Sequence, residues 1–132
     1  MARPKAKEIT ERELELMHVF WDRNQSETET ELTVSDVRDA LQKKGRDLAY
    51  TTVATLVRIL MEKDFLEQTN EERPFLYRAV RSFDEVSGSM LGDMIQKVFG
   101  GSREKLLVRL MEERRLTKKE LKALEDILRE KP

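Results

Sequence analysis

The chain has 132 residues, of which 39% are charged and 39% are apolar, and its formal net charge is −1. It contains no cysteine, which excludes a disulfide framework and a thiolate metal site, and no apolar run approaches the roughly 18 residues that span a membrane. The start of the chain lacks the apolar segment of a signal peptide, so we expect a cytoplasmic protein with one domain, or one domain and a helical appendage.

Charge is distributed unevenly along the chain. Residues 1–80 hold 13 Lys and Arg against 16 Asp and Glu, whereas residues 81–132 hold 12 against 10. Binding to nucleic acid must therefore depend on a local basic patch. Such a patch lies within residues 37–63, which contain the cations Arg38, Lys43, Lys44, Arg46, Arg58 and Lys63 and the acids Asp39, Asp47 and Glu62.

The N-terminal part predicts a basic arm followed by a helix. The arm, residues 1–9, either contacts phosphate or has no function. Thr10 and Glu13 form a capping box, in which each side chain accepts the other residue's free backbone N–H, and this predicts a helix start. The inner stripe of that helix is Leu14, Met17 and Trp21, flanked by Leu16 and Phe20. His18 is the only histidine, and with no cysteine beside it we expect no metal site there.

After an acidic loop at residues 24–31, a second capping box predicts a short helix. Thr33 provides the cap and Asp36 its partner, and Gly45 ends the helix after two lysines in the last turn. The apolar side of this helix is Val34, Val37, Ala40 and Leu41. The tight connection that follows leads into another helix, which is the pattern of a helix-turn-helix.

The next helix lies within residues 48–66 and has two contrasting faces. Its inward face is Val53, Leu56, Val57, Leu60 and Met61. Its other face carries three hydroxyls and one guanidinium, and we assign these four residues to DNA base contacts: Thr51, Thr52, Thr55 and Arg58. Short hydroxyls allow close approach to base edges and thymine methyl groups in the major groove. The alternative is a core helix whose threonines face solvent or cap its first turn.

Beyond Lys63 the apolar period changes from helical to alternating, which predicts a hairpin. Residues 65–69 and 75–79 form its strands and residues 70–74 its turn. A hairpin directly after the second helix of a helix-turn-helix is the winged arrangement. The residues we assign to DNA phosphate contacts are Lys43, Lys44, Arg46, Tyr50, Arg73 and Arg78.

Three more helices are predicted in the C-terminal part. Capping residues at Ser82, Ser102 and Thr117 start them, and a Gly-Gly pair at residues 100–101 separates the first from the second. Their apolar stripes exceed what they can bury against each other, so we expect a homodimer. The residues assigned to dimerisation are Val86, Met90, Met94, Ile95, Val98, Leu107, Leu110, Leu121, Leu124 and Leu128. The alternative is that these helices fold back on the winged domain.

Several segments resemble the penicillinase-repressor family of BlaI, MecI and CopY type. They are the helix start at residues 49–53, the strand at residues 75–78 and the Phe-Gly-Gly-Ser stretch at residues 99–102. The resemblance extends from Ile9 to about Leu128. It implies a dimeric transcriptional repressor that binds inverted-repeat operators in double-stranded DNA and is released by a signal. In some members a membrane-bound sensor metalloprotease causes cleavage of the repressor, and in others cysteines sense copper.

The chain departs from the family pattern in three respects. It has no cysteine, so the copper-sensing site is absent. Asp64 stands where a glycine usually ends the recognition helix, and Ile59 stands where many members carry arginine. The resemblance therefore leaves the helix end and the contacts near Ile59 open.

The sequence thus predicts a mainly α protein with a small β-hairpin. Residues 1–80 would form a winged helix-turn-helix DNA-binding domain and residues 81–132 a helical dimerisation region. Nothing predicts catalysis or a cofactor, because the chain lacks a second histidine, a phosphate-binding glycine loop and any metal-ligand spacing. A winged-helix adaptor that binds proteins and not DNA stays as the alternative, since residues 1–80 are acidic overall.

Overall fold

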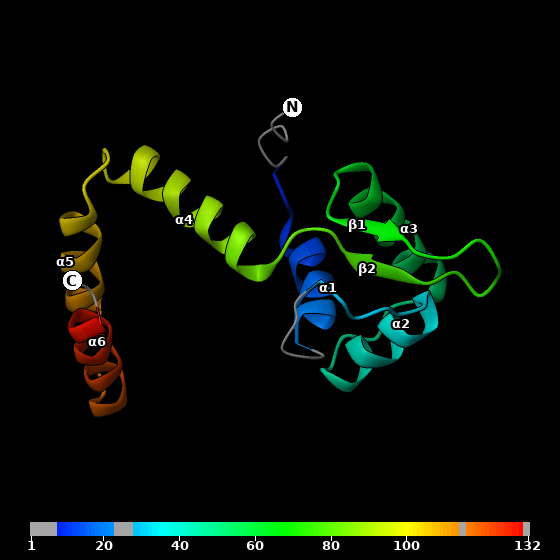
Figure 1. Cartoon of the computed structure of the whole chain (residues 1–132), viewed down its shortest axis with the longest axis horizontal. Helices are drawn as coiled ribbons and strands as arrows, with labels where there is room; N and C mark the ends of the chain where they lie inside the picture. Colours follow the sequence, from blue (N-terminus) through cyan, green and yellow to red (C-terminus); the bar gives the residue numbers. More distant parts are fainter. Residues whose placement is uncertain (1–7, 23–27, 114–115, 131–132) are drawn as a thin grey trace. The chain divides into compact units, whose positions relative to one another are not determined.

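The computed structural model describes residues 8–22, 28–113 and 116–130 (Figure 1). This part of the chain contains α1 (Glu11–Trp21), α2 (Val34–Lys43), α3 (Tyr50–Glu62), β1 (Leu66–Gln68), β2 (Tyr77–Ala79), α4 (Phe83–Val98), α5 (Arg103–Glu113) and α6 (Lys118–Glu130). The predicted fold class, mainly helical with one small hairpin, is confirmed. The chain divides into two compact units, Met1–Ser89 and Met90–Pro132. Most of the expected basic arm and part of the acidic loop lie outside the described residues.

The first two helices begin at the predicted capping boxes. The Thr10 hydroxyl accepts the Glu13 backbone N–H, while the Glu13 carboxylate accepts the Thr10 N–H at 3.0 Å. Thr33 and Asp36 make the same pair of bonds at the start of α2. These bonds satisfy N–H groups that the first turn of a helix leaves without intrahelical partners.

The core of the first unit forms where α1, α2 and α3 meet the hairpin. The predicted inward faces are confirmed, with Leu14, Ala40 and Met61 partly buried at the edge of the core. Its most deeply buried large side chains are Phe20, Phe65, Leu16, Met17, Leu60, Val37, Val53 and Val57. Because these side chains come from all three helices and from the residue before β1, the core fixes α3 against the hairpin.

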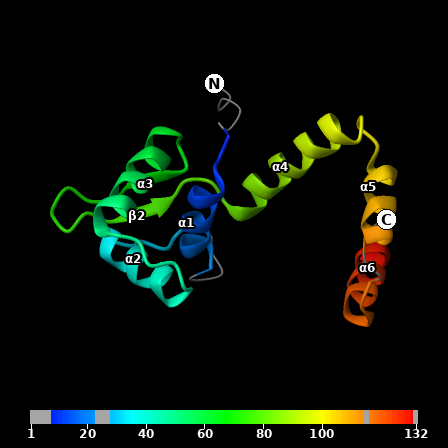
Figure 2. The ribbon, with the colours of Figure 1, turned by 180° about the vertical axis from the view of Figure 1, so that it is seen from behind.

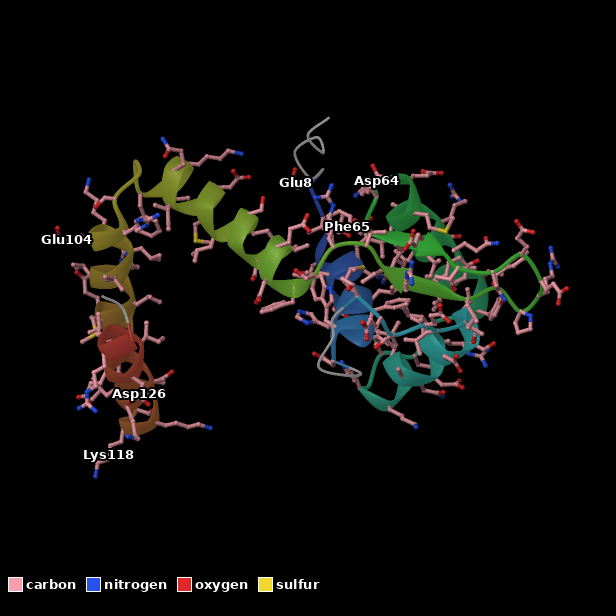
Figure 3. The ribbon with its side chains drawn as sticks, in the orientation of Figure 1. Glu8, Asp64, Phe65, Glu104, Lys118 and Asp126 are labelled. Carbon is pink, nitrogen blue, oxygen red and sulfur yellow. The ribbon has the colours of Figure 1, made fainter. Side chains whose placement is uncertain are left out.

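Asp64 ends α3 in the conformation that glycine favours. Its φ is 65°, in the left-handed region. The Asp64 N–H donates to the Met61 carbonyl, and the Phe65 N–H donates to the Leu60 carbonyl at 2.8 Å. This is a Schellman motif, so aspartate ends the helix as glycine would and turns the chain into β1. Figure 3 labels Asp64 and Phe65 at this junction.

The hairpin is shorter than predicted. β1 and β2 pair antiparallel with Leu66 opposite Ala79, and Tyr77 also bridges to Leu32. Beyond Gln68 one more backbone bond joins the two segments, from the Thr69 N–H to the Leu76 carbonyl at 2.8 Å. The Asn70 side chain then closes the turn, because its Oδ1 accepts the Leu76 N–H at 2.8 Å and its amide nitrogen donates to carbonyls of the turn. In both ribbon views this turn extends beyond α2 and α3 as a wing (Figure 1, Figure 2).

A buried arginine anchors the start of α4 to the first unit. Arg81 is 5% exposed, and its carbonyl accepts the Trp21 indole N–H at 3.0 Å. Its guanidinium donates to the Asp64 carbonyl and to the Glu85 carboxylate and lies over the Phe65 ring, 5.4 Å from the centroid. The first turn of α4 is therefore part of the winged unit.

The second unit contains most of α4 with α5 and α6. Ser102 and Thr117 cap the last two helices as predicted, through bonds from the N–H groups of Lys105 and Glu120. Many large apolar side chains along all three helices are between 39% and 69% exposed, whereas Ile95 on α4 and Leu106 on α5 are half-buried. None of the described helices is long and apolar enough to cross a membrane.

Candidate nucleic-acid interface

The outer face of α3 presents the four predicted base-contact residues. Thr51, Thr55 and Arg58 are exposed, and Thr52 is half-buried. The Thr55 hydroxyl donates to the Thr51 carbonyl at 2.9 Å, so it offers a methyl group and lone pairs to an approaching surface. Arg58 donates to Glu62 at 2.8 Å, and both side chains are more than 60% exposed. Such an exposed pair is weak, so the guanidinium can change partner at little cost.

The first turn of α3 lacks a side-chain cap. Its N-cap is Ala49, and no side chain accepts the first N–H groups, in contrast to the boxes on α1 and α2. Helix N-termini attract anions because their free N–H groups and the helix dipole point outward. Tyr50 is the first residue of α3 and is 48% exposed, so its phenol is also accessible at this end of the helix.

A groove of about 690 Å³ runs between α3, the start of α2 and the wing. Its floor is apolar, and two arginines come from opposite sides. The lining residues are Thr33, Val34, Ser35, Tyr50, Ala54, Val57, Arg58, Met61, Arg73, Pro74, Phe75 and Tyr77. The fold thus brings together three of the predicted contact residues, Tyr50, Arg58 and Arg73.

The wing side of the groove is aromatic and cationic. The Arg73 guanidinium lies over the Phe75 ring, 5.5 Å from its centroid. Burial raises the pKa of Tyr77, and the nearby Tyr50 raises it further. The positive charge of Arg73 lowers it but does not cancel these two effects. Tyr50 and Arg73 therefore both lie within electrostatic range of Tyr77. A phosphate placed there would meet a cation and hydroxyl donors.

The other predicted phosphate-contact cations lie away from this groove, and most already bind carboxylates. Lys44 donates to Asp22 at 3.1 Å, and Arg46 donates to both oxygens of Glu15 at 2.9 and 2.8 Å. Arg78 donates to Glu67 across the hairpin at 2.7 Å, and it points to the face opposite its neighbour Tyr77 because strand side chains alternate. Lys43 is exposed and has no carboxylate partner among the residues that the structure describes.

Sequence reasoning missed the acids that bind these cations. Glu11 and Glu15 on α1 and Asp22 at its C-cap recur at helical spacing, so they lie along one face. The sequence shows that spacing, but Arg46 comes 31 positions after Glu15, and a rule based on neighbouring residues cannot pair side chains so far apart. Glu13 is also 4% exposed, because it caps α1 and binds Lys63 at 2.7 Å.

Nine of the ten predicted dimerisation residues lie on helices of the second unit. Met94, Val98 and Leu128 are 49%, 69% and 65% exposed, as expected of side chains that a partner could cover. Val86 differs, because at 4% exposure it belongs to the core of the first unit and has little surface to offer a second chain.

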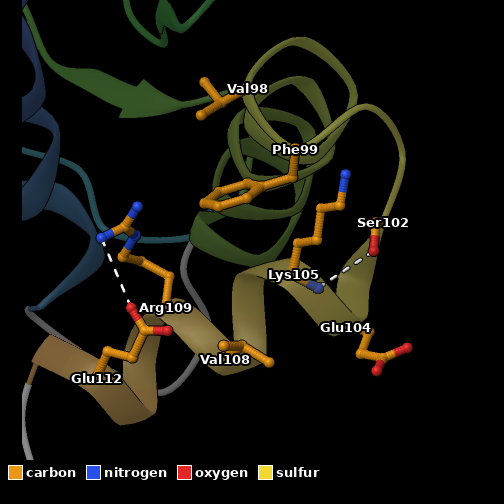
Figure 4. A pocket seen from close by; sticks show the side chains of 8 residues that line it. All are labelled: Val98, Phe99, Ser102, Glu104, Lys105, Val108, Arg109 and Glu112. Carbon is orange, nitrogen blue, oxygen red and sulfur yellow. Dashed lines mark hydrogen bonds and ion pairs between the residues drawn. The ribbon is translucent and has the colours of Figure 1, made fainter.

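A second groove, of about 560 Å³, lies within the second unit between the end of α4 and α5 (Figure 4). Its lining combines apolar side chains with charged ones, including an Arg109–Glu112 pair at 3.9 Å. The residues are Val98, Phe99, Ser102, Glu104, Lys105, Val108, Arg109 and Glu112. No group of His, Cys, Asp and Glu side chains suited to a metal ion occurs within the described ranges.

Comparisons with a family model, with curated proteins and with solved structures found the following similarities. A family model described as penicillinase repressor matches residues 9–130. Over 98 residues the chain is 36% identical to the transcriptional regulator BlaI of Mycobacterium tuberculosis, which covers 74% of this chain and 67% of that protein. Over 127 residues it is 24% identical to the methicillin resistance regulatory protein MecI of Mammaliicoccus sciuri, which covers 96% of this chain and 98% of that one. The crystal structure of the reduced form of MarR from E. coli superposes with a TM-score of 0.45 at 14% identity, over 92% of this chain and 76% of that chain.

Proposed function

The chain belongs to the penicillinase repressor family, and we propose that it acts as a homodimer that binds inverted-repeat operators and leaves them in response to an inducing signal. The family is one of winged-helix transcriptional repressors and not of enzymes. In this proposal residues 1–80 contact DNA and residues 81–132 hold the two chains together.

The exposed face of α3 carries the DNA-binding part of the proposal. It combines three threonines, Arg58 and an uncapped N-terminus, with no acid before Glu62. Threonine methyl groups suit thymine, and arginine suits guanine, in the major groove. With α3 in the major groove, DNA phosphates would meet Tyr50 and Arg73, which line the protein's own groove between α3 and the wing. Further phosphate contacts would come from Lys43, Lys44, Arg46 and Arg78.

The exposed apolar faces of the second unit support the dimer. Residues spaced along α4, α5 and α6 leave about half of their surface in water in the single chain. Isolated exposed leucines need no explanation, but stripes on three successive helices favour association with another copy. A two-fold dimer also presents two copies of α3, which match two half-sites of an inverted repeat.

A salt titration on selected DNA tests the proposed function. Sequences would first be selected from random duplexes with the intact protein, and their affinity would then be measured between low and physiological salt. We expect the selected sites to be inverted repeats and the logarithm of affinity to fall linearly with that of salt, since phosphate contacts release counterions. A winged-helix adaptor would select no sequence and would show no such slope.

Release would then act through the C-terminal helices. A single winged domain is expected to bind a half-site near the non-specific range of about 10⁻⁴ to 10⁻⁶ M. Joining two such domains adds avidity on the order of 10² to 10⁴, so separating them is enough to free the operator. Cleavage by a membrane-bound sensor protease is one signal that would act in this way.

The segment near Phe99 is the weak point that we propose for such cleavage. Gly92 lies within α4, where glycine costs about 1 kcal/mol relative to alanine, and Gly100 and Gly101 follow the helix with positive φ. A chain that ends at Phe99 should keep the circular dichroism of a folded winged unit and lose operator binding in a gel shift. If the truncated chain bound the operator as tightly as the intact chain, separation of the C-terminal helices would not be what releases the DNA.

A further inference from the structure

Helix α1 supplies carboxylates to the cations of the turn between α2 and α3. Arg46 uses two of its nitrogens for the two oxygens of Glu15, at 2.9 and 2.8 Å. Lys44, two residues earlier, donates to Asp22 at 3.1 Å. The pKa of Arg46 is raised by its hydrogen bonds to Glu15, then by the charge of Glu15 and more weakly by that of Glu11. Both cations therefore face an acidic stripe of the same chain.

The Arg46–Glu15 pair has the geometry of an arginine–phosphate contact. A carboxylate and a phosphate each offer two oxygens to the planar fork of a guanidinium, so Arg46 cannot serve both fully at once. The two side chains are 52% and 34% exposed, which makes the pair one that water and other anions can reach. Exposed pairs of this kind are weak, so a DNA phosphate can displace the carboxylate but must compete with it.

We propose that Glu15 occupies on Arg46 the position that a DNA phosphate takes in the complex, and that it thereby lowers the affinity of each winged unit for DNA of any sequence. This inference rests on the proposed function. Its consequence is that one winged unit alone is held weakly, so stable repression requires both copies. Asp22 acts on Lys44 in the same way, through a single hydrogen bond.

The test is a double-mutant cycle on the full-length protein. The variants are Glu15→Gln, Arg46→Met and the two combined, with thermal unfolding to verify that each is folded. The probe is a fluorescein-labelled duplex of mixed sequence, about 30 base pairs long so that both winged units of a dimer can contact it one or two helical turns apart. Affinity is measured by anisotropy across a salt series. Glu29→Gln removes the same charge from the same unit, and Glu29 has no hydrogen bond or ion pair with any described residue.

We expect Glu15→Gln to strengthen binding about two- to five-fold for each winged unit that contacts the duplex, the range that an exposed ion pair allows, and by about the square of that factor when both units of a dimer bind. Its salt slope should steepen by up to about one unit for each Arg46 released to phosphate. With methionine at position 46, the same change at Glu15 should have no effect. Glu29→Gln should change the affinity little.

Two results would overturn the inference. An equal gain from Glu15→Gln with and without Arg46 would mean that only the total charge matters. Unchanged or weaker binding by Glu15→Gln would mean that Glu15 orients Arg46 for DNA or joins α1 to the turn. Failure of the wild type to bind any duplex would instead count against the proposed function, so the two failures are distinguishable.

Discussion

Replacing Met94 with lysine is expected to separate the proposed dimer without unfolding the chain. Met94 is 49% exposed on α4 in the single chain, so a lysine there keeps its ammonium in water and changes folding stability by no more than about 0.5 kcal/mol. In a dimer that covers this side chain, the same lysine would enter an apolar contact. The substitution therefore acts on association and not on folding.

The size of the effect follows from the area that remains exposed. Burying a whole methionine side chain contributes about 1.5–3 kcal/mol, so covering the exposed half contributes about 1 kcal/mol, or about 2 kcal/mol for the two copies. The dissociation constant should then rise at least about 30-fold. Desolvation of two ammonium groups adds several kcal/mol more unless the lysines reach water at the rim.

Sedimentation velocity over a concentration series at micromolar levels measures this change. The wild type should sediment as a dimer and Met94→Lys as a monomer with an unchanged circular dichroism spectrum. Gln96→Lys is the matched control, because it adds the same charge to the same helix on the side away from Met94. A wild-type monomer, or a Met94→Lys dimer as tight as the wild type, would refute the reasoning.

Two further predictions concern the first unit. Glu13→Gln should lower stability by about 1–3 kcal/mol, because it removes the buried charge that binds Lys63 at 2.7 Å. The control is Glu11→Gln on the exposed face of the same helix, which should cost less than about 0.5 kcal/mol. Burial raises the pKa of Glu13, but the bonds from Lys63 and from the helix cap outweigh this and hold it below its usual range, so its stabilisation is lost as pH falls through that lowered value. Urea unfolding at neutral and acid pH should show the gap between Glu13→Gln and wild type closing in acid, and a constant gap would contradict the assignment. Arg73→Ala should weaken binding to all DNA sequences alike, because it removes a phosphate contact. Thr52→Val should instead change the base preference at one position of the site by about 1–3 kcal/mol. If both variants lost the same affinity on every sequence, the assignment of Arg73 to phosphates and Thr52 to bases would be wrong.

Local features of the fold were predictable because a few neighbouring residues determine them. The capping boxes at Thr10 and Thr33 need only two side chains in one helical turn. The inward faces of α1 to α3 follow from spacing alone. Asp64 shows the limit of such reasoning, because a non-glycine residue left the end of α3 in doubt, and only the backbone geometry shows that aspartate takes the left-handed conformation there.

Features that join distant segments were not predictable from spacing. Arg46 reads as an available cation in the sequence, and its pairing with Glu15 depends on how α1 packs beside the turn after α2. Val86 continues an apolar stripe that reads as one surface, yet the first turn of α4 packs into the core of the first unit. Periodicity identifies which side chains share a face, but packing decides what covers that face.

The pairing of cations with acids leads to a quantitative expectation for the salt slope. Among the described residues, Lys44, Arg46 and Arg78 bind carboxylates, while Lys43 and Arg73 do not. If only the two unpaired cations reach phosphates, a dimer makes four such contacts and the slope should be about −4. If all five cations reach phosphates, with Lys44, Arg46 and Arg78 giving up their carboxylates, a dimer makes ten contacts and the slope should approach −9. A slope near −4 would mean that the acids still bind their cations in the complex. A slope near −9 would mean that DNA displaces Glu15, Asp22 and Glu67 completely. The slope of the intact protein thus measures how far the winged unit's own carboxylates compete with DNA.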